Sequence, residues 1–225
     1  MHIEPGIVDA AKIGLSWATG AAAFSLMGKT VVDTLKSSNI AAFAARSAAA
    51  TALVFGFFEF LPHGPVGVSE VHLILGTTLF LIFGAGPAAV GLSLGLLVQG
   101  LFFAPFDLPQ YGMNVTTLLL PLFAMAALAK RIIPAGTAYK DLCYGQTLKL
   151  SLAFQGGIVA WVAFWAIYGQ GFGAANLANV ASFGAAYMSV ILLEPLVDLA
   201  VLAVAKLLSR SEGADLIQAR VYHAA

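Results

Sequence analysis

The first two residues of the chain carry the donor atoms of a metal chelate. As a free N-terminus, Met1 offers its α-amine, and His2 adds its backbone nitrogen and the Nδ1 atom of its ring. These three nitrogens close a five-membered and a six-membered ring on one ion, and a fourth donor from elsewhere completes a square plane. Planar nitrogen sites suit Cu(II) and Ni(II), and affinity rises from Co through Ni to Cu. The alternative interpretation is that His2 is an incidental polar residue at a chain terminus.

Three properties of the N-terminal segment 1–6 bear on this chelate. Histidine is too large a second residue for efficient methionine removal. No basic stretch followed by an apolar run and a small-residue cleavage site marks a secretory signal, so we expect residue 1 in the mature chain. Glu4, Pro5 and Gly6 predict a tight, stiff turn that folds the segment back toward the rest of the protein.

The other three histidines differ in their surroundings. Ser69 and Glu70 precede His72 at the start of an apolar stretch, where Ser69 predicts an N-cap and His72 falls in the first helical turn. An ionisable side chain in an apolar helix is a functional candidate, and a histidine bonded to a neighbouring helix is the plainer alternative. His63, between a proline and a glycine, is expected to be a solvated loop residue. His223, in the C-terminal tail, is expected to have no role in binding.

The composition predicts a membrane protein. Of the 225 residues, 60% are hydrophobic and 10% are charged, whereas a soluble domain carries roughly 25% charged residues. Eleven Lys and Arg balance eleven Asp and Glu, so the net charge indicates no nucleic-acid partner. The single cysteine, Cys143, excludes an internal disulfide framework and a cysteine-rich metal site.

Apolar runs predict an all-α polytopic bundle of six or seven transmembrane helices in a single domain over residues 1–225. A spanning helix needs roughly 17–25 mostly apolar residues. The candidate runs are Ile7–Met27, Ile40–Leu61, Glu70–Gly84, Pro87–Phe103, Asn114–Ala129, Leu142–Tyr168 and Val180–Leu208. A tail over residues 209–225 follows the last run.

Basic residues predict the orientation, because they accumulate on the cytoplasmic side of a cell membrane. With the N-terminus outside and the C-terminus in the cytoplasm, the inner loops and the tail hold Lys29, Lys36, Lys130, Arg131, Lys140, Lys206, Arg210 and Arg220. Arg46 and Lys149 lie near the same side, and Lys12 is the exception. The outer face then carries Glu4, Glu59, Glu70 and Asp107. Carboxylates without basic neighbours raise the local concentration of cations.

Four features of the sequence occur together in one known family. They are the opening Met-His-Ile with Gly6 soon after, His72 followed by Gly76-Thr77, the later Gly86-Pro87, and Gly112-Met113-Asn114. In this layout the chain resembles the CbiM/NikM group, the substrate-binding membrane subunits of cobalt and nickel energy-coupling factor (ECF) transporters. The sequence departs from the family pattern in having Pro5 before Gly6, a longer interval after His72, and a different loop over residues 107–111.

The resemblance implies a metal held in a square plane by four nitrogens. Carried onto this chain, they are the Met1 amine, the His2 amide nitrogen, the His2 ring and the His72 ring. The ion, Co²⁺ or Ni²⁺, is then cargo rather than a cofactor, and the N-terminal segment tucks into the outer cavity of the bundle. Imported metal serves either cobalamin biosynthesis or a nickel enzyme.

Three further residues are candidates for the surroundings of the metal. Asn114 either orders the loop over the metal and hydrogen-bonds a liganding group, or acts as the N-cap of its helix. Glu70 and His63 are expected to lie near the ligands without binding the metal themselves.

Glu194 and Asp198 stand four residues apart in the last apolar run, and therefore on one face of a helix. A charge pair between Asp198 and Lys149 is the structural interpretation, and a proton or metal relay is the functional one. Pro195 predicts a kink in this helix.

The sequence favours a transport subunit that depends on partners for energy, not an enzyme. It contains no G-x-x-x-x-G-K-[ST] loop for ATP hydrolysis. By resemblance, a transmembrane coupling (T) subunit, two ATPase (A) subunits and an optional small accessory membrane subunit complete the complex. Gly14, Ala18 and Ala22 form a small-residue face that docks the T subunit or packs within the chain.

The alternative function is a self-sufficient metal permease or channel. An intramembrane protease or a retinal protein fits poorly, because H-E-x-x-H and a mid-helix lysine in the last run are both missing.

Overall fold

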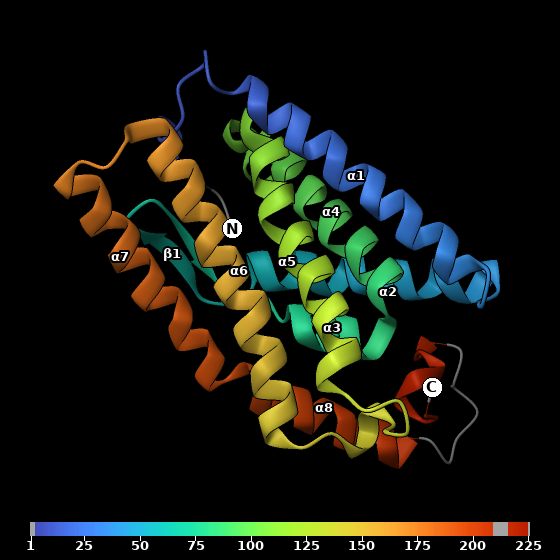
Figure 1. Cartoon of the computed structure of the whole chain (residues 1–225). Coiled ribbons are helices and arrows are strands. Elements are labelled where there is room, and N and C mark those ends of the chain that lie inside the picture. Colours follow the sequence, from blue (N-terminus) through green and yellow to red (C-terminus); the bar gives the residue numbers. More distant parts are fainter. Residues whose placement is uncertain (1–2, 209–215, 225) are drawn as a thin grey trace.

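The computed structural model of the chain describes residues 3–208 and 216–224 (Figure 1). Its α-helices are α1 (Gly14–Leu35), α2 (Ile40–Glu59), α3 (Gly76–Phe83), α4 (Ala85–Phe102), α5 (Tyr111–Ile132), α6 (Tyr144–Gln170), α7 (Ala174–Met188) and α8 (Glu194–Leu208). Short 3₁₀ segments are η1 (Pro105–Gln110), η2 (Tyr139–Asp141), η3 (Ser189–Leu192) and η5 (Ala219–Val221). One antiparallel hairpin, β1 (His63–Val66) and β2 (Ser69–His72), interrupts the helices.

Five helical stretches of the described chain are long and apolar enough to cross a membrane. They are Ile40–Glu59, Ala85–Phe102, Pro105–Ile132, Tyr144–Gln170 and Ala174–Leu207. The helical, polytopic membrane fold predicted from the sequence is therefore confirmed.

The first helix is displaced along the chain relative to the predicted run Ile7–Met27. Residues 7–13 form turns, and α1 begins at Gly14 and continues to Leu35. Its additional turns are polar on one side, where the carboxylate of Asp33 accepts from Lys29 at 3.1 Å. Such i, i+4 pairs support helix in sequence that hydropathy alone does not mark as helical.

The predicted span Glu70–Gly84 is wrong, because its first three residues belong to a β-strand, residues 73–75 are irregular and only Gly76–Phe83 is helical. The reversal depends on Gly67, which has φ +64 at the first position of a two-residue hairpin loop. A Cβ atom at Gly67 would also lie 2.1 Å from the backbone oxygen of Asn179 on α7. Ser69 is consequently no N-cap, and His72 ends a strand instead of opening a helix.

The predicted helix Val180–Leu208 is broken into two. Helix α7 ends at Met188, the 3₁₀ turn η3 follows, and α8 begins at Glu194. The break comes directly before Pro195, whose ring cannot continue an uninterrupted helix and whose nitrogen donates no hydrogen bond. The disruption expected at Pro195 is confirmed, and it is larger than a kink.

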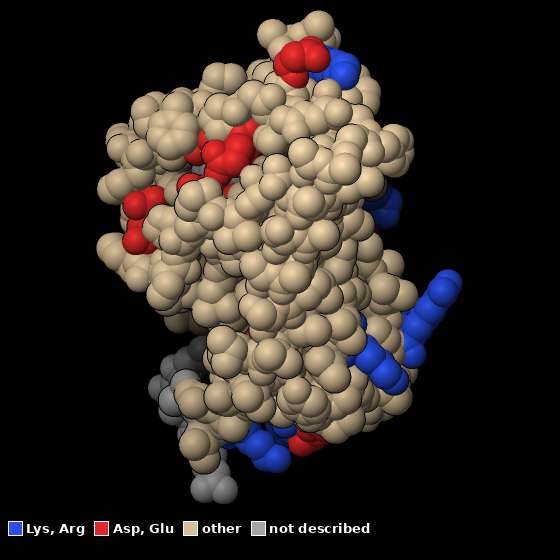
Figure 2. Space-filling view, turned by 90° about the vertical axis from the view of Figure 1, so that its left-hand side faces the viewer, with Lys and Arg blue, Asp and Glu red and all other residues tan. Residues whose placement is uncertain are grey.

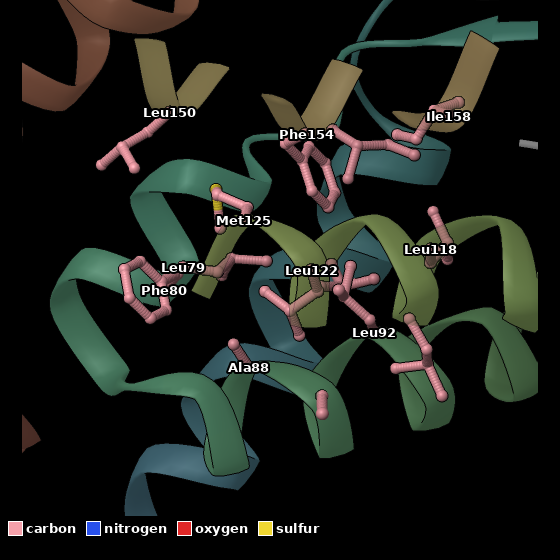
Figure 3. Close-up of a cluster of buried hydrophobic side chains, with 14 of the residues drawn as sticks. Leu79, Phe80, Ala88, Leu92, Leu118, Leu122, Met125, Leu150, Phe154 and Ile158 are labelled. Carbon is pink, nitrogen blue, oxygen red and sulfur yellow. The ribbon is translucent and has the colours of Figure 1, made fainter. Parts of the chain in front are cut away.

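The hydrophobic core lies between α3, α4, α5 and α6. Figure 3 shows side chains from these four helices meeting in one cluster: Leu79, Phe80, Ala88, Leu92, Leu118, Leu122, Met125, Leu150, Phe154 and Ile158. Helix α2 packs closely on α4 through Gly91 and Gly95, where added Cβ atoms would meet Ala50 and Val54 at 2.5 Å. Small residues allow this approach of backbones inside a membrane bundle.

The described part of the C-terminal tail packs against the bundle. The backbone N–H of Gln218 donates to Ile82 O at 2.8 Å, and its side-chain amide donates to Phe80 O and Leu81 O. Val221 is fully buried. These contacts occupy carbonyls in the last turn of α3, where a helix leaves C=O groups without partners of its own; the exception is Phe80 O, which also accepts from the N–H of Gly84 at 3.0 Å.

Charged residues separate along the bundle. Figure 2 shows acidic side chains mostly in the upper half of one face, and Lys and Arg mostly in the lower half. One cleft is lined by basic residues of four segments, namely Lys29 of α1, Arg46 of α2, Lys130 of α5 and Arg220 of the tail. These segments therefore meet at the same end, which we call the basic end. Lys12 is the exception, and its ammonium group donates to Tyr168 O at 3.0 Å.

Gly91→Ala should destabilise the bundle, because its Cβ would lie 2.5 Å from the Ala50 side chain and 2.8 Å from the Ala50 carbonyl carbon. Such overpacking costs about 1–3 kcal/mol, so the unfolding temperature of the detergent-purified protein should fall. Gly156→Ala on α6 is the matched control, since nothing lies within 4 Å of that Cβ position. Equal unfolding temperatures for the two variants would contradict the close α2–α4 contact.

Candidate metal centre

The hairpin places two histidines opposite each other. His63 on β1 pairs with His72 on β2 in the antiparallel register. Directly opposed residues project to the same face of a two-stranded sheet. Their rings stack with centroids 4.8 Å apart and planes inclined by 11°. The expectations that His63 is exposed and lies near a predicted ligand are met, but His63 is in a strand and not in a loop.

His72 is fully buried and held from three sides. Besides the His63 ring, the edge of the Phe58 ring from α2 meets it at 5.1 Å between centroids. Its Nε2 atom lies 2.9 Å from Oε2 of Glu70, which is two residues earlier on the same strand and therefore on the same face. A carboxylate beside an imidazole nitrogen fixes the orientation of the ring and raises its basicity as a ligand. The expected proximity of Glu70 to His72 is present.

The N-terminal segment adds to the edge of the hairpin. Ile3 forms an antiparallel bridge with Ser69, and the N–H of Glu4 donates to Val68 O at 3.3 Å. Ile3 is fully buried. The turn predicted at Glu4-Pro5-Gly6 is confirmed, because Gly6 has φ +91 and the N–H of Ile7 donates back to Glu4 O at 3.1 Å.

Asn114 anchors this segment from helix α5. Its Oδ1 accepts the backbone N–H of Ile3 at 3.0 Å, and its side chain is 1% exposed. Helix α5 begins at Tyr111 with Gln110 in the N-cap position, so the interpretation of Asn114 as an N-cap is wrong. The other role considered for Asn114 was ordering a neighbouring segment, and its hydrogen bond with Ile3 is a contact of that kind.

The structure describes only one of the three residues predicted to bind the metal. His72 is described, whereas Met1 and His2 lie outside the described residues 3–208 and 216–224. Within those residues, no group of three or more His, Cys, Asp or Glu side chains is placed to hold a metal ion. A metal at His72 therefore requires donors other than a conventional side-chain cluster of the described chain.

The sequence of this chain matches the model of a known protein family. The model of the cobalt uptake substrate-specific transmembrane region, CbiM, matches residues 2–211. The chain belongs to the CbiM family. It is accordingly a multi-pass membrane component of metal uptake, and its CbiM-family membership covers the hairpin, Asn114 and all eight α-helices.

Two crystal structures share the fold of this CbiM-family chain. One is described as a transition metal transporter, with a TM-score of 0.69, 17% sequence identity, and coverage of 94% of this chain and 95% of the other. The second is described as a truncated transition metal transporter, with a TM-score of 0.68, 19% identity, and coverage of 94% and 100%. Comparison with curated protein sequences finds no match.

Sequence reasoning missed the hairpin and the aromatic contact that encloses His72. The signal for the hairpin is present, since Gly67 stands between two short valine-containing runs after the Pro62 break. The apolar character of residues 70–84 concealed it, because a buried strand and a buried helix look alike in hydropathy. Phe58 carries no local signal of its contact with His72.

Asn114→Ala should loosen the N-terminal segment, because the buried N–H of Ile3 would lose its acceptor at a cost of about 1–3 kcal/mol. We expect faster amide hydrogen exchange over residues 3–7, measured by mass spectrometry, with unchanged exchange in α4 and α6. Thr117→Ala is the matched control, since the Thr117 hydroxyl is buried on the same helix and bonds only Met113 O, at 2.8 Å. An anchor at Asn114 is refuted if both variants exchange like the wild type.

Proposed function

We propose that this chain is the substrate-binding subunit of an ATP-driven ECF importer for cobalt or nickel. The observation that carries the proposal is the bridge between Ile3 and Ser69 on the strand that ends at His72. Ser69 is three residues from His72 along this strand, and Ile3 is two residues from Met1 in the sequence. Two residues span at most about 7 Å. Because Met1 and His2 are joined directly to Ile3, their donor atoms are within reach of the hairpin.

The proposed ligands are the Met1 amine, the backbone nitrogen and ring of His2, and the ring of His72. Nitrogen donors of this kind form planar sites for Ni(II) and Cu(II), while imidazole also accepts other transition metals. In this proposal Glu70 orients the His72 ring, His63 covers it, and Asn114 holds Ile3. The set uses a terminal amine and a main-chain nitrogen, which agrees with the lack of a three-residue side-chain cluster in the described chain.

The proposed orientation has the N-terminus outside and the C-terminus in the cytoplasm. The basic end, which α1, α2, α5 and the tail share, then faces the cytoplasm according to the positive-inside rule. The hairpin and the N-terminal segment lie toward the outer side and receive the metal there.

The proposed partners supply the energy. Because the chain has no P-loop motif, two A subunits hydrolyse ATP and a T subunit transmits the motion. Gly14, Ala18 and Ala22 are exposed along α1, which fits docking of a T subunit helix on this small-residue face. A small accessory membrane subunit is an optional further partner. A self-sufficient permease is the alternative function, and it predicts uptake that persists when the Walker lysines of both ATPases are replaced.

Metal binding to the purified chain tests the proposed site. With Co²⁺, Ni²⁺, Cu²⁺ and Zn²⁺ offered together, we expect one bound equivalent of cobalt or nickel per chain with an unmodified N-terminus. His2→Ala, N-terminal acetylation, or residues added before Met1 should abolish binding, because each removes a chelating nitrogen. His72→Ala should weaken binding by more than about 100-fold, the upper end of the losses typical for residues that only support a ligand.

His63→Ala is the matched control for His72→Ala. It removes the imidazole stacked on His72 without removing a proposed ligand, so affinity should change by less than about 10-fold, the lower end for such supporting residues. If His63→Ala is as damaging as His72→Ala, the fourth ligand is misassigned. Tight binding by an N-terminally extended chain would contradict the chelate.

A further inference from the structure

Glu194 is a fully buried carboxylate that residues of two other helices contact. Its Oε1 accepts the backbone N–H of Thr77 at 3.1 Å. Its Oε2 accepts the hydroxyl of Ser151 and, at 2.8 Å, the side-chain amide of Gln155. Glu194 opens α8, Thr77 lies in the first turn of α3, and the other two residues are on α6. The carboxylate thus joins three helices at one point.

One function of this contact is to cap α3. The N-cap position of α3 is Leu75, which makes no side-chain capping bond. The first N–H groups of a helix have no partner within it, and they favour a negative charge nearby. Glu194 supplies that acceptor from a distant part of the chain. The position and direction of α3 therefore depend on α8.

A second contact leads from Glu194 toward His72. The Gln155 amide that donates to Glu194 also donates to Ile74 O at 3.1 Å. The N–H of Ile74 in turn donates to His72 O at 3.0 Å. Gln155 and Thr77 together hold the connection 72–77 between the strand and α3, and Glu194 accepts from both. We call Glu194, Gln155 and Thr77 the α8 clamp.

Nothing in the described chain neutralises this carboxylate as a salt bridge. Asp198, one turn further along α8, is also buried and accepts from the Thr78 hydroxyl at 2.6 Å. The pair predicted between Asp198 and Lys149 is wrong, because Lys149 is exposed and no ion pair joins them among the described residues. A buried acid in a membrane bundle is expensive and is a functional candidate by default.

We infer that Glu194 is a positioning residue for the metal site, acting through the α8 clamp on the connection that carries His72. This inference rests on the proposed function, since it assumes that His72 binds the metal. Helix α8 also reaches the basic end, where Lys206 contacts Asp141 at 3.5 Å. A shift of α8 at that end moves the clamp, and the clamp moves His72. The connection provides a route by which partners at the basic end weaken the hold on the metal.

The test compares two substitutions that make the same chemical change on α8. Glu194→Gln keeps the size of the side chain but, in either orientation of the amide, turns a nitrogen toward one of the clamp's donors. The Kd for the bound metal should rise about 10–100-fold, as for other residues that orient a ligand. Asp198→Asn changes an equally buried carboxyl group four residues away, whose contact with α3 is at Thr78, outside the connection 72–77. Its Kd should therefore stay within about 3-fold of the wild type, on the order of one weak contact.

Two further readouts separate positioning from a general loss of structure. Bound Cu²⁺ should change its electron paramagnetic resonance parameters in Glu194→Gln and not in Asp198→Asn, because only the first shifts a ligand. Amide exchange over residues 72–77 should accelerate in Glu194→Gln alone. Gln155→Met removes the hydrogen bond to Ile74 O without changing α8, and it should reproduce both effects. If Glu194→Gln fails to fold, Gln155→Met tests the positioning role in its place.

The outcomes distinguish this inference from the proposed function. A wild-type Kd in Glu194→Gln and Gln155→Met overturns the inference and leaves the metal site standing. Equal weakening in Glu194→Gln and Asp198→Asn also overturns it, because the effect is then one of buried charge. The proposed function itself is refuted if the wild-type chain binds no metal. It is also refuted if the His72→Ala variant binds the metal as tightly as the wild type.

Discussion

A backbone N–H or C=O group that leaves water inside a membrane protein must find its partner within the protein. Helices satisfy this demand internally, but this chain carries non-helical backbone at residues 3–7 and 63–75, part of which is buried against the helices. The hairpin ladder satisfies part of it, and side chains from the helices satisfy the rest. Asn114 accepts from Ile3, Gln155 donates to Ile74, and Glu194 accepts from the start of α3. The rest of the site depends on these few polar contacts.

The same contacts make the irregular segments suitable for binding. Beyond its first turn, a helix commits its main-chain N–H groups to its own hydrogen bonds, whereas an inserted strand and a folded-back terminus bring main-chain groups and a buried imidazole together. His72 is held by a strand partner, by Phe58 of α2 and by Glu70, so little conformational freedom of its ring would be lost on the metal binding that we propose. The apolar helices around it remove competing water, which strengthens each polar contact inside.

Prediction from the sequence succeeded where one local property was sufficient. The runs Ile40–Leu61, Pro87–Phe103 and Leu142–Tyr168 lie within two residues of α2, α4 and α6 at each end, because continuous apolar sequence of that length has one stable form in lipid. It failed for residues 70–75, where apolar character permits strand and helix alike. It also ended the first helix too early, at Met27, because Lys29 was assigned to a loop, although Lys29 pairs with Asp33 within the helix.

By itself the sequence determined a helical membrane bundle, a separation of basic from acidic ends, and the residue types available for chelation near its start. These follow from composition, from the length of apolar runs and from chemistry carried by single residues. Only the tertiary structure decided that Ile3 reaches Ser69, that His63 and Phe58 enclose His72, and that Glu194 caps a helix more than a hundred residues away. Each of these contacts joins segments distant in the chain. Their existence depends on how hairpin and helices pack, which no local pattern specifies.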